Sequence, residues 1–94
     1  MLKITENLEN GKTVRLRLDG TLSNESFDEL THAFSLHRDG VGRTIIVDMA
    51  GVDYMNDRVA RELANLRGEY LRIINCSPFI AALLETIGKA ELGE

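Results

Sequence analysis

The stretch that most constrains the fold is residues 43–67, RTIIVDMAGVDYMNDRVARELANLR. Within it, a strand-like apolar run is followed by apolar residues at helical spacing. Residues 44–49 form an almost unbroken apolar run rich in β-branched side chains, which is typical of a strand buried on both faces of a parallel sheet. Residues 50–55 contain a glycine and predict a turn-bearing connection. Apolar residues then recur at helical spacing, which predicts a helix over 57–67. The stretch therefore forms a strand–loop–helix unit.

Two adjacent residues are candidates for the start of this helix. Asn56 and Asp57 both carry side-chain oxygens that accept hydrogen bonds from the unpaired amides of a first helical turn. A helix N-terminus at the carboxyl end of a parallel strand is also where α/β proteins usually place their functional groups. Spacing alone leaves two interpretations open, a helix cap and a functional position.

The residues before this unit predict a β-hairpin. Residues 2–5 alternate weakly and predict a short edge strand, and residues 13–19 alternate clearly between apolar and charged side chains. Asn10-Gly11 lies between them and is a typical hairpin-turn dipeptide. Residues 20–22 are expected to leave the sheet. The charged side of the second strand, which carries Arg15 and Arg17, is expected to face either water or a second copy of the chain.

A helix is predicted after the hairpin, beginning among residues 23–26, which offer several capping side chains. It is expected to end near His37 or Arg38, because the glycine-containing segment 39–42 follows. His32 and His37 are expected to face solvent near the end of this helix. The apolar stripe of this helix is expected to consist of Phe27, Leu30, Ala33, Phe34 and Leu36.

The end of the chain predicts one more strand and one more helix. Residues 70–75 are mostly apolar and predict a second buried strand, and Ser77-Pro78 is a helix start signal. The helix is expected to end at Gly88, with a frayed tail after it. Its apolar stripe is expected to consist of Phe79, Ile80, Leu83, Leu84 and Ile87.

The element order is therefore ββαβαβα. Strand–helix–strand connections of this length imply parallel pairing with right-handed crossovers, whereas the first hairpin is antiparallel. The predicted fold class is α/β, with residues 1–94 forming a small single-domain layered sandwich of a mixed four-stranded sheet and about three helices.

Composition excludes several classes of function. The net charge of −4 and the absence of a basic stripe argue against a nucleic-acid partner. No segment approaches the roughly 18 to 20 apolar residues that cross a bilayer, so no direct membrane insertion is expected. The single cysteine, Cys76, argues against an intrachain disulfide framework and favours a cytoplasmic protein in which this thiol is buried and inert. We find no catalytic, metal-ligating or phosphate-loop pattern, and we therefore expect neither an enzyme nor a cofactor.

Several short motifs follow one another in a distinctive order. They are Leu18-Asp19-Gly20-Thr21-Leu22, then Ile46-Val47-Asp48-Met49-Ala50-Gly51-Val52, then the loop 53–59, and finally Asn75-Cys76-Ser77-Pro78 with Leu83-Leu84 and Gly88. Together they resemble the STAS domain, the sulphate-transporter and anti-sigma-factor-antagonist family, over nearly the whole chain. The loop 53–59 takes the place of the phosphorylation loop of that family.

The resemblance implies a non-catalytic, bacterial, cytoplasmic interaction module similar to an anti-anti-sigma factor. Its expected partner is an anti-sigma factor or kinase, whose binding frees a sigma factor in a partner-switching cycle. An alternative is an accessory subunit of a membrane transporter, such as the partner of an ABC-type ATPase in lipid transport, or a scaffold domain of a signalling complex. Pairing with a second copy of the chain in a homodimer is a further alternative. The resemblance implies a partner-binding site made of Asp53, Tyr54, Met55, Asn56, Asp57, Arg58, Arg61 and Glu62.

The chain departs from the family pattern in two ways. Asp57 occupies the phosphoacceptor position, where regulatory members carry serine, and no hydroxyl other than the Tyr54 phenol remains in the loop. The ordinary serine phosphoswitch is therefore expected to be absent, and Asp57 either mimics a phosphoserine through its permanent charge or only caps the helix. The segment from Asp57 to Tyr70 is also several residues shorter than usual, so its helix is expected to end about one turn early.

Overall fold

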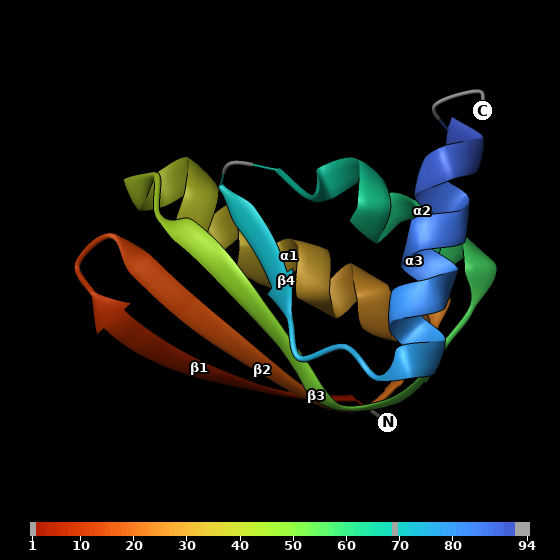
Figure 1. Cartoon of the computed structure of the whole chain (residues 1–94). Coiled ribbons are helices and arrows are strands. Elements are labelled where there is room, and N and C mark those ends of the chain that lie inside the picture. The colour runs from red at the N-terminus through yellow and green to blue at the C-terminus, as the bar shows by residue number, and fades with distance from the viewer. Residues whose placement is uncertain (1, 69, 92–94) are drawn as a thin grey trace.

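A mixed sheet and three helices follow one another in the predicted order ββαβαβα (Figure 1). The computed structural model describes residues 2–68 and 70–91. The elements are β1 (Leu2–Asn10), β2 (Thr13–Leu22), α1 (Asn24–Val41), β3 (Thr44–Met55), α2 (Asp57–Leu66), β4 (Leu71–Ile74) and α3 (Pro78–Glu91).

The strands lie in the spatial order β1-β2-β3-β4, with β1 antiparallel to β2 and the other neighbours parallel. The helices cover one face of this sheet (Figure 1). Ile45, Val47 and Met49 point into the core, whereas Ile46 on the other face is only half-buried. The prediction that both faces of residues 44–49 are covered is therefore wrong, because the uncovered face carries charged side chains such as Arg15 and Arg17 instead of a second helical layer.

The two central strands are longer than their sequence patterns predict. Residues 20–22 were expected to leave the sheet and residues 50–55 to form a connection, yet these segments pair with each other, Thr21 with Tyr54 and Leu22 with Met55. Two irregularities in the β2–β3 register accommodate the break in alternation, and Gly20 adopts a positive φ of 116°. Cross-strand pairing thus converts two expected loops into strand.

Helix α1 is longer than predicted at its carboxyl end. Ser23 is the N-cap and accepts a hydrogen bond from Ser26 N–H at 3.2 Å. The helix passes His37 and ends at Val41, and its C-cap is Gly42, whose φ of 70° lets its N–H donate to the Arg38 carbonyl at 3.0 Å. The predicted end near His37 or Arg38 is about one turn early because Gly42 supplies the left-handed residue.

Helix α3 begins as predicted and ends later. The Ser77 side chain accepts from Ile80 N–H at 3.3 Å, which confirms the cap, and the helix continues through Gly88 to Glu91. Ile80 and Leu84 are buried in the core. Phe79 is exposed, so the prediction that it belongs to the apolar stripe is wrong. The Ile87 side chain and residues 92–94 of the expected tail lie outside the described part of the chain.

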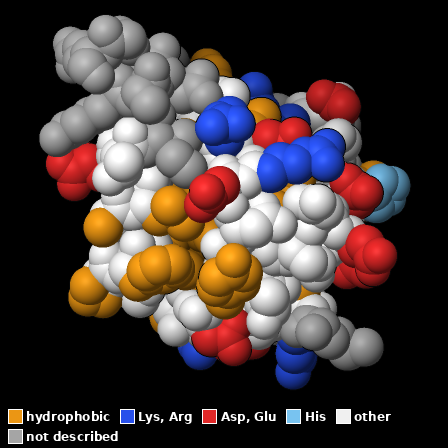
Figure 2. Space-filling view, turned by 90° about the vertical axis from the view of Figure 1, so that its right-hand side faces the viewer, with side chains coloured by type: hydrophobic (Ala, Val, Ile, Leu, Met, Phe, Trp, Pro, Cys, Tyr) orange, Lys and Arg blue, Asp and Glu red, His pale blue; other side chains and the backbone are white. Residues whose placement is uncertain are grey.

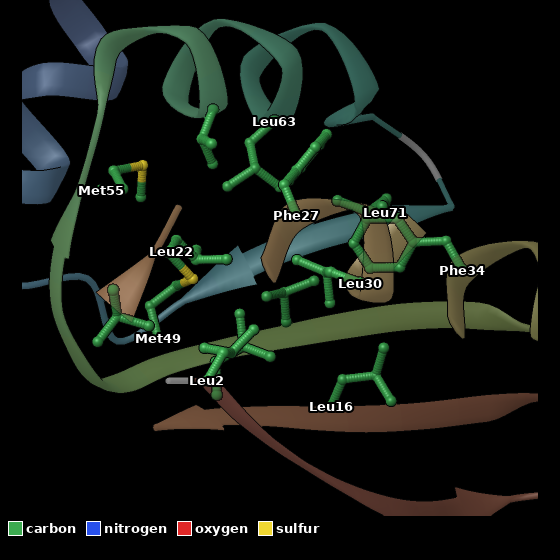
Figure 3. Close-up of a cluster of buried hydrophobic side chains, with 14 of the residues drawn as sticks. Leu2, Leu16, Leu22, Phe27, Leu30, Phe34, Met49, Met55, Leu63 and Leu71 are labelled. Atoms are coloured by element: carbon green, nitrogen blue, oxygen red, sulfur yellow. The ribbon is translucent and has the colours of Figure 1, made fainter. Parts of the chain in front are cut away.

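The core lies between the sheet and the helices (Figure 3). Helix α1 contributes the predicted stripe except Leu36, which is exposed. Helix α2 contributes Val59, Ala60 and Leu63, and packs against α3. Figure 3 shows Phe27 and Leu63 meeting above the sheet, so the position of α2 is fixed by contacts with α1 as well as with α3.

Candidate partner-binding site

The candidate site lies where β3 ends and α2 begins. Strand alternation in this segment buries Val52 and exposes Asp53, and the buried residue before α2 is Met55, which is 1% exposed. Met55 was included in the predicted partner-binding set, but its side chain packs in the core and is not available on the surface. Asp53 is held by β2, because Thr21 Oγ1 donates to Asp53 Oδ1 at 3.0 Å.

Asn56 begins helix α2 and joins it to α1. Its Oδ1 accepts from Val59 N–H at 2.8 Å, and its Nδ2 donates to Asn24 Oδ1 at 3.1 Å. Asn56 is therefore the N-cap, and Asp57 is the first helical residue, with an exposed carboxylate. Asp57 does not act as the cap, and its charge lies at the positive end of the helix dipole.

Tyr54 forms an exposed aromatic pair beside this helix start. Its ring stacks on Phe79 of α3 with a centroid separation of 6.5 Å and an interplanar angle of 18°. Tyr54 is 52% exposed and Phe79 is 56% exposed. Figure 2 shows hydrophobic side chains gathered on the side of the molecule where α3 and the end of β3 lie. The segment 53–57 therefore combines exposed apolar area at Tyr54 with the exposed carboxylates of Asp53 and Asp57.

Sequence analysis missed Phe79 because it placed this residue on the apolar stripe of α3. Adjacent helical residues point about 100° apart, so Phe79 and Ile80 cannot both face the core centrally. Ile80 is the one that is fully buried. The pairing of consecutive large apolar residues at the start of a helix was the signal that one of them faces outward.

The exposed side of α2 carries positively and negatively charged side chains. Arg58 Nε lies 3.8 Å from Glu62 Oε1, one turn along the helix, and both side chains face solvent to a large degree. Arg61 is also exposed on this helix. Such an exposed pair contributes little to stability, roughly 0.3–0.5 kcal/mol, so these side chains are available for intermolecular contacts at small cost.

A groove runs between α1 and α2 beside these charges. One part has a volume of about 300 Å³ and is lined by Phe27, Thr31, Glu62, Asn65 and Leu66. The next part, about 260 Å³, shares Leu66 and reaches Tyr70, whose ring lies 4.3 Å below the Arg38 guanidinium carbon. The α1 wall of this groove was not predicted from the sequence, because it forms only when two helices distant in the chain pack together.

Asp48 organises the opposite, uncovered face of the sheet. It is 5% exposed, and its Oδ1 accepts from Ala50 N–H at 3.0 Å and from Asn75 Nδ2 at 3.1 Å. Burial alone would raise the pKa of Asp48, but these two hydrogen bonds together with the positive charges of Arg17 and Arg15 hold the pKa below its ordinary value. The carboxylate therefore stays ionised and ties the end of β4 to β3.

Three other sequence expectations concern His32, His37 and Cys76. His32 is exposed as predicted, but His37 is buried, with Nε2 2.9 Å from Glu6 Oε1 of β1. The solvent-facing prediction for His37 fails because α1 continues past it over the sheet. Cys76 is half-buried, and burial raises the pKa of its thiol despite the opposing charge of Arg67. A protonated thiol is a poor nucleophile.

The described residues 2–68 and 70–91 contain no group of three or more His, Cys, Asp or Glu side chains that could hold a metal ion. In the same part of the chain, no helix combines the length and apolarity that crossing a membrane requires.

No protein-family model matches the sequence, and no curated protein matches it. Solved structures do match. The anti-sigma factor antagonist SpoIIAA in its unphosphorylated form is 20% identical, with a TM-score of 0.66 over 88% of this chain and 82% of that chain. The chain has a STAS-like fold.

Two further structures agree with this fold. Phosphorylated SpoIIAA from Bacillus is 21% identical, with a TM-score of 0.63 over 95% of this chain and 86% of that chain. An uncharacterised protein from Shewanella loihica with a SpoIIAA-like fold is 14% identical, with a TM-score of 0.57 over 83% of this chain and 69% of that chain. The predicted fold class and the resemblance stated from the motifs are confirmed at the level of the STAS-like fold.

Proposed function

We propose that this chain is a non-catalytic interaction module of the anti-sigma-factor-antagonist type, which binds a protein partner through residues 53–58 and the exposed side of α2. The observation that carries the proposal is the site at the start of α2, within a fold like that of an anti-sigma factor antagonist. There Tyr54, whose ring stacks on Phe79, lies three residues before the exposed Asp57. An apolar centre bordered by charges is a common composition for a protein interface.

The partner class that we propose is an anti-sigma factor or kinase. SpoIIAA, whose fold this chain shares, is an anti-sigma factor antagonist that exists in phosphorylated and unphosphorylated forms. Asp57 carries one permanent negative charge at the first position of α2 and no hydroxyl. The site therefore binds without a serine phosphorylation switch at this position.

A crosslinking capture tests the proposed surface. A photo-crosslinking amino acid replaces Arg58 on α2, and a matched variant carries it at Arg72, which is exposed on β4. Each protein is irradiated in extract from its native cell, and adducts are identified by mass spectrometry. An anti-sigma factor or kinase crosslinked at position 58 and not at 72 is the expected result. A transporter ATPase at position 58 would support the accessory-subunit alternative, and adducts confined to position 72 would overturn the proposed surface.

The role of Asp57 has a separate test. If its charge mimics a phosphoserine, Asp57→Ser changes affinity for the captured partner by about fivefold or more, the scale of one charge at a helix N-terminus. The control is Asp39→Asn, which removes an exposed charge near the C-terminus of α1 and is expected to leave the affinity unchanged. Equal affinities of the native chain and Asp57→Ser, measured by isothermal titration calorimetry, would show that Asp57 is not a phosphoserine mimic.

A further inference from the structure

Strand β1 is a long free edge of the sheet. It comprises nine residues and lies outermost in the order β1-β2-β3-β4, where β2 is its one neighbour among the described strands (Figure 1). Its side chains are exposed from Thr5 to Asn10, whereas the other edge strand, β4, has only four residues. One row of backbone N–H and C=O groups of β1 therefore faces away from the sheet. Such an edge is a template for pairing with another strand unless the sequence prevents it.

We propose that β1 pairs antiparallel with β1 of a second copy of this chain, in a register centred on Glu6, so that two sheets join into one. This register places Lys3 opposite Glu9 of the second copy, and Ile4 opposite Leu8. Thr5 then lies opposite Asn7. Each contact occurs twice by symmetry, so the edge is complementary to itself in both charge and apolarity.

Shifting this register by two residues, the smallest shift that keeps side chains on the same face, removes the complementarity. In one direction Ile4 meets Glu6 and Lys3 meets Asn7. In the other direction Glu6 meets Leu8 and Ile4 meets Asn10. Of these three registers, the central one gives Lys3 and Glu9 a partner of opposite charge and also gives Ile4 and Leu8 an apolar partner. The bulge at Glu9, between Leu8 and Asn10, ends regular pairing at Leu8, so the Lys3–Glu9 pair lies at the margin of the paired segment. Glu9 Oε1 also lies 2.9 Å from Arg15 Nε of its own chain, so Lys3 would share this carboxylate with Arg15.

The described part of the chain covers Ile4 only in part and leaves Leu8 largely exposed. Leu8 is 56% exposed and Ile4 is partly buried against the core. Both have even positions on β1, as has Glu6, which reaches His37 of the covering helix α1. They therefore share the helix-covered face of the sheet. A two-fold axis perpendicular to the sheet keeps both sets of helices on that face, so Leu8 of each copy is covered by Ile4 of the other.

The centre of the register brings two Glu6 residues opposite each other, which by itself is unfavourable. Each carboxylate, however, has a partner within its own chain, because His37 Nε2 lies 2.9 Å from Glu6 Oε1. This contact draws the carboxylate towards α1 and away from the two-fold axis. His37 thus removes the main obstacle to pairing in this register.

The oligomeric state of the full chain is the first test. Sedimentation equilibrium is measured over a concentration series for the native chain, Leu8→Lys and the control Leu66→Lys, which changes an exposed leucine on α2. The expected result is a reversible dimer for the native chain and for Leu66→Lys, with dimerisation weakened at least tenfold in Leu8→Lys. A native chain that stays monomeric at submillimolar concentration would overturn the proposal.

Disulfide trapping tests the register. Thr5→Cys and Asn7→Cys are made separately in a Cys76→Ser background, which removes the native thiol. Directly opposed residues have the separation that a disulfide needs, whereas diagonal neighbours, about 7–8 Å apart, do not. A disulfide-linked dimer is expected in the mixture of the two variants and not with either alone. Thr5→Cys alone and Asn7→Cys alone are the controls, because each residue lies diagonal to its own copy in this register and is expected to give little product. Equal yields from the mixture and from either variant alone would contradict the register centred on Glu6.

Discussion

At the scale of single residues, Asp48 gives a pH-dependent prediction. Its pKa in the folded chain is lower than the ordinary value of 3.8, so the ionised carboxylate stabilises the fold at neutral pH. This stabilisation is lost as the pH falls through 3.8 and then through the lower folded pKa. We expect Asp48→Asn to lower the free energy of unfolding by about 1 kcal/mol at pH 7, because its charge-assisted hydrogen bonds are weakened.

Urea unfolding at pH 7 and at pH 3 measures this difference. The gap between the native chain and Asp48→Asn is expected to narrow at pH 3, because this pH is below the ordinary pKa of 3.8 and the carboxyl of the unfolded chain binds a proton there more readily than the folded one. The control is Asp39→Asn, which alters an exposed carboxylate on α1. An equal loss of stability at both pH values would show that the charge of Asp48 is not what stabilises this face.

Gly51 gives a second prediction at this scale. A Cβ at this position would overlap the Asp19 carboxylate and lie 2.8 Å from the Leu18 carbonyl oxygen. We expect Gly51→Ala to lower stability by about 1–3 kcal/mol through this overpacking, measured by thermal unfolding. Adding Asp19→Ala is expected to restore only part of the loss, since the Leu18 oxygen belongs to the backbone. Full recovery in the double variant would show that β2 moves to make room.

At the scale of elements, the start of α2 depends on one side chain. Asn56 caps the helix, so Asn56→Ala is expected to lower the free energy of unfolding by about 1 kcal/mol. Asn56→Asp keeps the accepting oxygen and loses only the donor to Asn24, so it is expected to cost less. Urea unfolding of both variants and of Asn24→Ala separates the two contributions. Equal losses in Asn56→Ala and Asn24→Ala would assign the stability to the link between helices instead of the cap.

At the scale of the whole molecule, α2 is anchored to the core by the buried side chains on its inner face. Leu63 is fully buried and Leu66 is largely exposed, three residues further along the same helix. Leu63→Ala is expected to cost about 2–5 kcal/mol, a large part of the stability of a 94-residue domain. Leu66→Ala is expected to change stability by about 0.5 kcal/mol or less. Denaturant midpoints measure both, and similar losses would mean that the groove between α1 and α2 closes in solution.

The sequence alone determined the order of elements, the hairpin and most of the core, and the resemblance of its motifs to the STAS family led to the fold. These features follow from short-range rules, because strand alternation, helical spacing and caps such as Ser77 act within a few residues. The motifs also led to the surface at the start of α2. Asn56 and Asp57 lie at the start of this helix as predicted, although spacing did not decide which of them is the cap.

Only the tertiary structure decided the features that join distant segments. Pairing of Thr21 with Tyr54 lengthened β2 and β3, and packing of α1 across the sheet buried His37 against Glu6. Packing of α3 against α2 placed Phe79 beside Tyr54, and packing of α1 beside α2 formed the groove. Local sequence patterns indicate whether a residue is apolar and on which face of its own helix or strand it lies. They do not record which other element lies opposite, and that is why these contacts became visible only in the folded chain.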